Sequence, residues 1–196
     1  MIHIIYMAAG NSRRFGSNKL LHEWKGKKLY RYMLDALLEV AEELPQVRVR
    51  VVTQYEEILK MVEELAKREA PGFLTGIYSP ESVNGLSYTI RKALDFEAAD
   101  PPDYFAFFTA DTPELSAADI RDFLEEFFAS GHSVACVRCG EAYGNPAVFS
   151  WKYAPLFQTL TGDQGGKKVL NQLLDDCFFY ELPERSRRDI DTPEDL

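Results

Sequence analysis

Short apolar runs alternate with segments of helical spacing along most of the chain. The runs are rich in β-branched and aromatic residues, which predicts strands. The segments between them repeat apolar residues every three or four positions, which predicts amphipathic helices. The predicted strands are residues 2–6, 47–53, 104–110, 133–139 and 177–182, with a short strand inside the loop-rich segment 71–85, and the predicted helices are residues 29–44, 56–68, 86–96 and 117–128.

This alternation of strand and helix is typical of α/β proteins, whose ligands bind at the carboxyl ends of the strands. The run 104–110 is apolar throughout, as in parallel strands that are buried on both faces. After Cys139 the pattern changes to a turn and short strand at 144–149 and two segments of helical spacing at 151–160 and 164–174. No repeat, low-complexity stretch or linker divides the chain, so we predict a single domain over residues 1–196.

Composition limits the possible partners and compartments. The chain has 196 residues, a length suited to one α/β domain, with 46% hydrophobic and 27% charged residues. Its formal net charge is −9, which disfavours nucleic acid and anionic membranes as partners. The sequence contains neither an apolar run of about 18 residues nor a signal segment at Met1, so we expect a cytoplasmic protein.

The three cysteines, Cys136, Cys139 and Cys177, do not form a disulfide framework. Cys136 and Cys139 make a C-x-x-C with His132 four residues before it, which could be half of a zinc site. No second C-x-x-C or H-x-x-H completes such a site. The pair also lies in a predicted strand, where residues three apart point to opposite faces. We therefore predict buried, reduced cysteines.

The loop after the first predicted strand, residues 7–21, carries the most informative chemistry. It combines Gly10 and Gly16 with small and polar residues, so its backbone can approach a ligand closely. Cations at the end of a strand suit a polyphosphate, whereas a glycine-rich turn with solvated cations is the structural alternative. Neither G-x-x-x-x-G-K-[ST] nor G-x-G-x-x-G is present. Between residues 11 and 28 the single acid is Glu23, and the basic residues are Arg13, Arg14, Lys19, Lys25, Lys27 and Lys28.

Residues 7–19 resemble the signature L-A-A-G-x-S-x-R-[MF]-G-x-x-K of the nucleotidyltransferases that activate molybdenum cofactor. Met7 replaces the usual leucine. The Ala-Ala-Gly form resembles the molybdenum cofactor cytidylyltransferases, whereas the guanylyl enzymes have Ala-Gly-Gly. The resemblance implies that the triphosphate is held by Lys19 and Arg14 and that the nucleotide is approached by Ala8, Ala9, Gly10, Asn11 and Ser12.

The same resemblance implies a fold like that of the nucleotide-diphospho-sugar transferases. This fold is a Rossmann-like α/β/α arrangement of three layers around a mostly parallel sheet. The nucleotide-binding part would extend to about residue 115, and the acceptor-side part would cover about 116–196.

Asp111 is the first candidate metal ligand. It follows the apolar run 104–110, where a carboxylate is costly to bury unless a cation or hydrogen bonds relieve it. An Asx turn before Pro113 is the structural alternative. Residues 108–113 resemble the family's G-D-x-P segment, whose aspartate holds Mg²⁺, with Ala110 and Thr112 as departures.

A second carboxylate cluster lies near residue 190. Asp189 and Asp191 are two positions apart and would share one face of an extended segment. An exposed acidic terminus is the alternative. Residues 189–195 resemble the D-I-D-T-P-E-D motif of the cytidylyltransferases without departure. The resemblance implies that Mg²⁺ is bound by Asp111 together with Asp191, which we favour over Asp189.

Three further segments resemble the family. Residues 85–89 are similar to its G-x-S-x-S, and Gly85, Ser87 and Thr89 would offer free N–H donors and hydroxyls to a base or ribose. An ordinary helix cap is the alternative. Two departures fall on the acceptor side: in 162–167 a lysine replaces the arginine of G-D-x-G-[AG]-R, and in 144–146 an asparagine replaces the histidine of G-H-P. The implied acceptor-side residues are Asn145, Asp163, Gly165 and Lys167.

The implied reaction is attack of a terminal phosphate of molybdopterin or molybdenum cofactor on the α-phosphorus of CTP, with release of pyrophosphate. Mg²⁺ would be the cofactor, and a molybdoenzyme would receive the product. A GTP-dependent guanylyltransferase of the same family is the nearest alternative, which Ala9 disfavours. A sugar- or polyol-phosphate nucleotidyltransferase fits segments 162–167 and 189–195 poorly. A non-catalytic cofactor carrier would differ from an enzyme in releasing no pyrophosphate.

Overall fold

The computed structural model describes residues 1–12, 15–16, 18–70, 72–95, 102–183, 186, 189–190, 192 and 195. Seven described strands form one sheet, and a two-stranded hairpin lies outside it. The sheet strands are β1 (Ile2–Met7), β4 (Val47–Thr53), β5 (Leu74–Tyr78), β6 (Tyr104–Thr109), β7 (Val134–Cys139), β8 (Ala142–Ser150) and β9 (Cys177–Glu181). The helices are α1 (Leu29–Glu43), α2 (Glu56–Arg68), α3 (Leu86–Ala93), α4 (Ala117–Ser130), α5 (Ala154–Phe157) and α6 (Gly166–Leu170).

The strand order is β5-β4-β1-β6-β8-β7-β9, and β8 alone of these runs antiparallel to its neighbours. The mostly parallel sheet expected from the sequence is therefore confirmed. In the register of the three central strands, Met7 lies beside Val52 of β4 and Thr109 of β6. The segments that follow these three strands thus begin at the same edge of the sheet.

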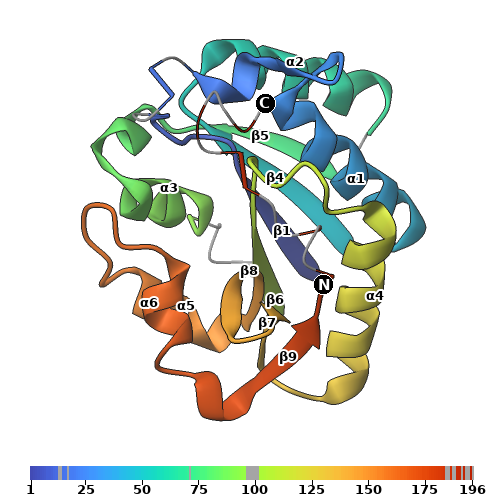
Figure 1. Cartoon of the computed structure of the whole chain (residues 1–196), viewed down its shortest axis with the longest axis vertical. Coiled ribbons are helices and arrows are strands. Elements are labelled where there is room, and N and C mark those ends of the chain that lie inside the picture. The colour runs from blue at the N-terminus through green and yellow to red at the C-terminus, as the bar shows by residue number, and fades with distance from the viewer. Residues whose placement is uncertain are drawn as a thin grey trace.

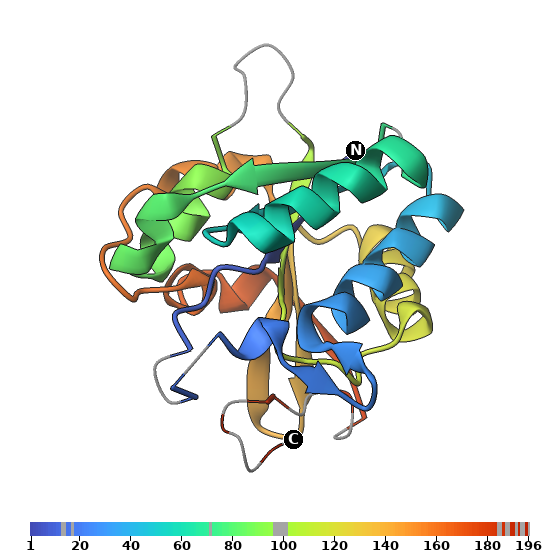
Figure 2. The same cartoon turned by 90° about the horizontal axis from the view of Figure 1, so that it is seen from above.

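Helices cover both faces of the sheet, which confirms the three layers (Figures 1 and 2). On one face α1, α2 and α4 pack their apolar sides against β1, β4 and β6, with Leu34 and Ile58 completely buried. On the other face α3, α5 and α6 form a second core around Phe105 and Phe157. Each predicted helix has one apolar face, and this is the face that the structure buries against the sheet.

The structure differs from the sequence-based expectation mainly after Cys139. The segment 151–160 contains a short 3₁₀ turn, η3 (Trp151–Tyr153), and the four-residue α5, and the α-helix within 164–174 is the five-residue α6. Conversely, β8 has nine residues rather than the short strand expected at 144–149. Its polar first half pairs with β7 across a bulge, and backbone hydrogen bonds to a neighbouring strand compensate for weak local propensity.

Two short elements were not anticipated: the 3₁₀ turn η1 (Lys19–Leu21) and the hairpin of β2 (Glu23–Trp24) and β3 (Lys27–Lys28). Another 3₁₀ turn, η2 (Pro80–Asn84), precedes α3, and η4 (Leu174–Asp176) precedes β9. None of the helices in the described part of the chain has the length and apolar character needed to cross a membrane.

The prediction of reduced cysteines is confirmed. All three are free, with Cys136 and Cys177 buried and Cys139 only partly exposed. The sulfur atoms of Cys136 and Cys177 lie 3.7 Å apart on the neighbouring strands β7 and β9. This contact raises the pKa of Cys136, and burial raises it further, so Cys136 remains a neutral thiol.

Candidate active site

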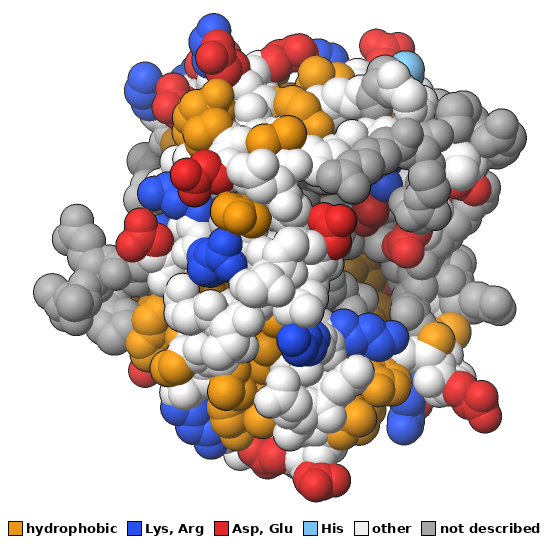
Figure 3. All heavy atoms as spheres, turned by 90° about the vertical axis from the view of Figure 1, so that its left-hand side faces the viewer, with side chains coloured by type: hydrophobic (Ala, Val, Ile, Leu, Met, Phe, Trp, Pro, Cys, Tyr) orange, Lys and Arg blue, Asp and Glu red, His pale blue; other side chains and the backbone are white. Residues whose placement is uncertain are grey.

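A cavity of about 610 Å³, the main cavity, opens where β1 and β6 end. Figure 3 faces this edge, and a hollow opens to the right of its centre, with acidic side chains above it and basic side chains below it. Nine of the residues predicted from the sequence line the main cavity: Ala9, Gly10, Asn11, Ser12, Lys19, Thr89, Asp111, Asn145 and Asp163. The structure therefore brings together segments that are more than 150 positions apart in the chain.

The loop after β1 is held by two residues that follow β4. Gln54 donates from Nε2 to the Ala9 carbonyl oxygen at 2.6 Å and to Asn11 Oδ1 at 3.0 Å. Tyr55 donates its hydroxyl proton to the Gly10 carbonyl oxygen at 2.7 Å. Two carbonyl oxygens of the loop are thus hydrogen-bonded to the segment after β4. Sequence reasoning missed Gln54 and Tyr55, although their position directly after a buried strand marks the binding edge of an α/β sheet.

Ala8 and Asn11, both predicted to approach the nucleotide, have different surroundings in the structure. Ala8 is completely buried in the apolar core and does not line the main cavity. Asn11 donates from Nδ2 to the Val83 carbonyl oxygen at 3.1 Å. Since Val83 belongs to η2, this bond connects the loop after β1 to the segment that precedes α3.

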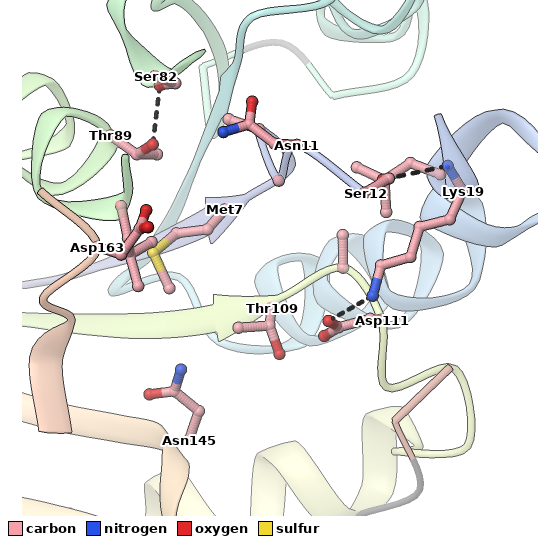
Figure 4. Close-up of a pocket in the computed structure, with 15 residues that line it drawn as sticks. Met7, Asn11, Ser12, Lys19, Ser82, Thr89, Thr109, Asp111, Asn145 and Asp163 are labelled. Carbon is pink, nitrogen blue, oxygen red and sulfur yellow. Dashed lines mark hydrogen bonds and ion pairs between the residues drawn. The ribbon is translucent and has the colours of Figure 1, made fainter. Parts of the chain in front are cut away.

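The charged end of the main cavity, defined by Lys19 and Asp111, is built from three distant segments. Lys19 is 8% exposed, and its Nζ lies 3.0 Å from Asp111 Oδ2 and 2.7 Å from the Ile190 carbonyl oxygen. The Ile190 N–H donates in turn to the Asp111 carbonyl oxygen at 2.9 Å. Ser12 Oγ accepts the Lys19 backbone N–H at 3.2 Å (Figure 4). The ion pair and backbone bonds hold the segment after β6, η1 and the segment around residue 190 together.

Tyr6 of β1 lies behind this charged end. Burial raises the pKa of Tyr6 well above its ordinary value, and the nearby charge of Asp111 raises it further. The phenol therefore stays neutral and donates to the Tyr30 carbonyl oxygen at 2.7 Å. This arrangement excludes Tyr6 as a proton acceptor for catalysis.

A second cavity of about 310 Å³ adjoins the main cavity, since both are lined by Thr109, Asp111 and Asn145. The predicted carboxylates Asp111 and Asp189 both line this second cavity. In the part of the chain that the structure describes, no three His, Cys, Asp or Glu side chains lie together as a metal cluster. Asp191 and Arg14, the other two residues predicted to hold metal and triphosphate, lie outside the described residues.

The opposite end of the main cavity, the neutral end, is formed by η2 and α3. Thr89 and Ser82 line it, whereas Ser87 is completely buried and its hydroxyl has no hydrogen-bond partner. The Ser87 backbone N–H donates to the Gly162 carbonyl oxygen at 3.0 Å. The expectation that this N–H is a free donor for a ligand is therefore wrong, because the Gly162 carbonyl oxygen accepts it.

Gly85 has a conformational requirement. Its φ of +129° is unusual for residues with a side chain, and a Cβ there would lie 2.5 Å from the Gly162 carbonyl oxygen and 2.9 Å from Asp163 Oδ1. The start of α3 and the loop at 162–163 thus approach each other closely. Gly85 thus lies where the segment predicted to bind the nucleotide meets the segment predicted to lie on the acceptor side.

The residues predicted for the acceptor side divide between the two cavities. Asn145 lines both, Asp163 lines the main cavity, and Gly165 and Lys167 line the second. Lys167 Nζ lies 4.9 Å above the centre of the Tyr143 ring, in the geometry of a cation–π contact. Asn145 stands in β8, the antiparallel strand beside β6.

Within the predicted cluster of cations, Arg13 and Arg14 lie outside the described residues, and the lysines are paired with acids. Beyond Lys19 with Asp111, the described lysines of the hairpin form ion pairs with carboxylates of α1, α2 and the segment before α4. These pairs are Lys25 with Glu114, Lys27 with Asp35, and Lys28 with Glu57. The hairpin lysines line neither cavity. Their ion pairs therefore attach the hairpin to the neighbouring helices and do not form part of the site.

Known proteins resemble the chain in sequence and in fold. The chain is 30% identical to the purine catabolism protein PucB of Bacillus subtilis, over 97% of this chain and 92% of PucB. Rv0371c of Mycobacterium tuberculosis, whose structure is also known in complex with manganese, superposes with a TM-score of 0.75 at 18% identity, over 99% of this chain and 94% of Rv0371c. Molybdopterin-guanine dinucleotide biosynthesis protein A of Archaeoglobus fulgidus superposes with a TM-score of 0.64 at 18% identity, over 98% and 94% of the two chains.

These neighbours share the fold of this chain, and the match to a family model defines its class as a nucleotidyltransferase domain. The model of the MobA-like NTP transferase domain matches residues 4–177, most of the chain. The chain belongs to this family, as the resemblance of residues 7–19 to its signature predicted.

Proposed function

We propose that the chain is a metal-dependent cytidylyltransferase that transfers CMP from CTP to a molybdopterin-type acceptor. In this reaction a terminal phosphate oxygen of the acceptor forms a bond to the α-phosphorus of CTP. The bond from that phosphorus to the bridging oxygen of the β-phosphate breaks, and pyrophosphate leaves. Because the attacking phosphate is already ionised, no general base is required, and the site's task is alignment and neutralisation of charge.

The convergence of Lys19, Asp111 and Ile190 carries this proposal. Lys19 reaches the main cavity from a partly buried position in which a cation acts strongly on a phosphate. Asp111 orients the lysine through their 3.0 Å ion pair until a ligand competes for it. The Ser12 hydroxyl fixes the backbone from which Lys19 extends. In this proposal Lys19 binds the triphosphate, and Arg14 assists it.

The residues fit a divalent cation. Asp111 and Asp189 both line the second cavity, and carboxylate oxygens are the donors that Mg²⁺ and Mn²⁺ prefer. We propose that these residues and Asp191 hold Mg²⁺, which when bound would neutralise charge on the phosphates. The manganese complex of Rv0371c, a protein of the same fold, supports a divalent ion in this type of structure.

The choice of CTP rests on Ala9, which is 4% exposed and lines the main cavity. A methyl group at this position narrows the space available to a base and favours a pyrimidine over a purine. The acceptor would enter the second cavity, where Asn145, Gly165 and Lys167 face it. The name of the Archaeoglobus neighbour supports a molybdopterin-type acceptor, although that protein acts with a guanine nucleotide by name.

Pyrophosphate release tests the proposal. The purified chain is incubated with Mg²⁺ and each of the four NTPs, with and without molybdopterin. We expect pyrophosphate in amounts equal to product, with CTP and only when the acceptor is present. Release with GTP instead would make the chain a guanylyltransferase, and binding of nucleotide without release under any condition would make it a carrier.

A further inference from the structure

Three hydroxyl groups form a continuous hydrogen-bonded chain at the neutral end of the main cavity. Thr89 Oγ1 donates to Ser82 Oγ at 2.8 Å (Figure 4). Ser82 Oγ donates in turn to Ser79 Oγ at 2.9 Å. All three residues are 2% exposed. Thr89 and Ser82 line the cavity, whereas Ser79 lies behind them and does not. The hydroxyls of Thr89 and Ser82 thus border the cavity from which a ligand would approach, and the hydrogen bond to Ser79 fixes them from behind.

The middle hydroxyl controls what the outer one can offer. Each hydroxyl donates one hydrogen bond and accepts up to two. When Thr89 donates to Ser82, its oxygen can only accept a hydrogen bond from a ligand. When the chain runs in the opposite direction, Ser82 donates to Thr89 and the Thr89 proton is released toward the cavity. The direction of the Ser82–Ser79 hydrogen bond therefore determines, through the Ser82 hydroxyl, whether the Thr89 hydroxyl donates to a ligand or accepts from it.

The surroundings of this chain suit a nucleobase better than a phosphate. Lys19 lies at the other end of the main cavity, and the carboxylate of Asp163 lies beside the start of α3 (Figure 4). A carboxylate repels phosphate but accepts hydrogen bonds from amino groups. Met7 and Leu86 also line the cavity and provide apolar surface for a flat ring.

We propose that Ser82 is a positioning residue for nucleobase selection, acting with Ser79 behind it to orient the Thr89 hydroxyl toward the amino or carbonyl edge of the base. This inference rests on the proposed nucleotidyltransferase function and adds the means by which the base is distinguished. Neither Ser79 nor Ser82 stands out in the sequence, because both lie in a short polar turn before α3.

Calorimetric titration of the full chain with CTP, GTP and pyrophosphate, each with Mg²⁺, tests the proposal. Pyrophosphate probes the charged end alone. We expect Ser82→Ala to weaken CTP binding about three- to tenfold, as for the loss of one neutral hydrogen bond, and to reduce the ratio of CTP to GTP affinity. Binding of pyrophosphate should not change. Ser79→Ala should act in the same direction but less, and Ser130→Ala, which removes a remote hydroxyl bonded to the Phe127 carbonyl oxygen, should have no effect.

Two results would overturn the proposal. One is unchanged CTP affinity and unchanged base preference in Ser82→Ala. The other is an equal loss for CTP and pyrophosphate, which would make the hydroxyl chain a general structural element. If Ser82→Ala does not fold, Thr89→Val removes the outer hydroxyl at nearly constant volume and must show the same selective loss. A wild-type chain that binds pyrophosphate but no nucleotide would refute the proposed function itself, and the inference with it.

Discussion

The two ends of the main cavity are assembled in different ways. At the charged end, Lys19, Asp111 and Ile190 come from segments up to 171 positions apart and are held by an ion pair and backbone hydrogen bonds. At the neutral end, Ser79, Ser82 and Thr89 lie within eleven consecutive residues and are joined by hydroxyl groups.

This difference separates two tasks. In the proposed function the charged end acts on phosphate, and in this chain its partly buried ion pair of Lys19 and Asp111 forms only because distant segments converge. Recognition of a neutral ring requires only short-range hydrogen bonds and can be built from one turn and the helix after it. Changes at the charged end should therefore affect turnover, and changes at the neutral end should affect nucleotide preference.

The largest effect is expected for Asp111→Ala. Loss of the carboxylate removes a proposed metal ligand and should reduce kcat at least about a thousandfold. The variant also removes the ion pair between Asp111 and Lys19, so its thermal stability should fall slightly. Turnover is measured by pyrophosphate release, with circular dichroism to verify folding. Asp111→Asn keeps the shape of the side chain and removes its negative charge, and it serves as the matched variant. A folded Asp111→Ala variant with more than a tenth of wild-type activity would contradict the assignment.

Lys19→Ala should have the next largest effect. Losing one charge-assisted contact should weaken CTP and pyrophosphate binding about tenfold to a hundredfold and slow turnover as well. Because the two ligands share only the phosphates, both should be affected equally in calorimetric titrations. Lys60→Ala, which removes an exposed lysine of α2, serves as the control. A selective loss of CTP binding would place the base, rather than the phosphates, near Lys19.

Gly85→Ala tests the contact between the two parts of the site. The new Cβ would meet the Gly162 carbonyl oxygen at 2.5 Å, and the positive φ is itself unfavourable, so the variant should lose about 1–3 kcal/mol of stability. The displaced loop carries Asp163, so CTP binding should weaken severalfold while pyrophosphate binding does not. Gly131→Ala has a positive φ of 71° with no atom near its Cβ, and it isolates the conformational cost. Equal melting temperatures for the two variants would show that the loop yields without strain.

Ala9→Gly should have the smallest effect. Removing the methyl group should reduce the preference for CTP over GTP by about threefold to tenfold, with little change in CTP turnover. The ratio is measured as kcat/KM for both nucleotides with one acceptor. Ala110→Gly makes the same change beside Asp111 and should leave the ratio unaltered. A wild-type preference for GTP would overturn the cytidylyl assignment and leave the fold untouched.

The sequence by itself determined the architecture of the first part of the chain. The apolar run of β6 and the single apolar faces of α1 and α2 are local patterns that do not depend on what lies opposite them, and the structure has these elements at nearly the predicted bounds. The signature around Gly10 likewise identified the family from adjacent residues. In the second part, β8 and the short α5 and α6 were poorly predicted, because their conformation depends on hydrogen bonds and burial supplied by distant strands.

Only the tertiary structure decided which side chains act together. The sequence predicted that Lys19 and Asp111 serve one site, but their ion pair and its third member, the Ile190 carbonyl oxygen, result from the register of β1 and β6 and from docking of the segment around residue 190. The sequence equally favoured Ser87 and Thr89 at the start of α3. The rotation of that helix buried one hydroxyl without a partner and connected the other to Ser82. A spacing of two residues on a helix turns side chains by about 200°, so packing, rather than the motif, determined which hydroxyl faces the cavity.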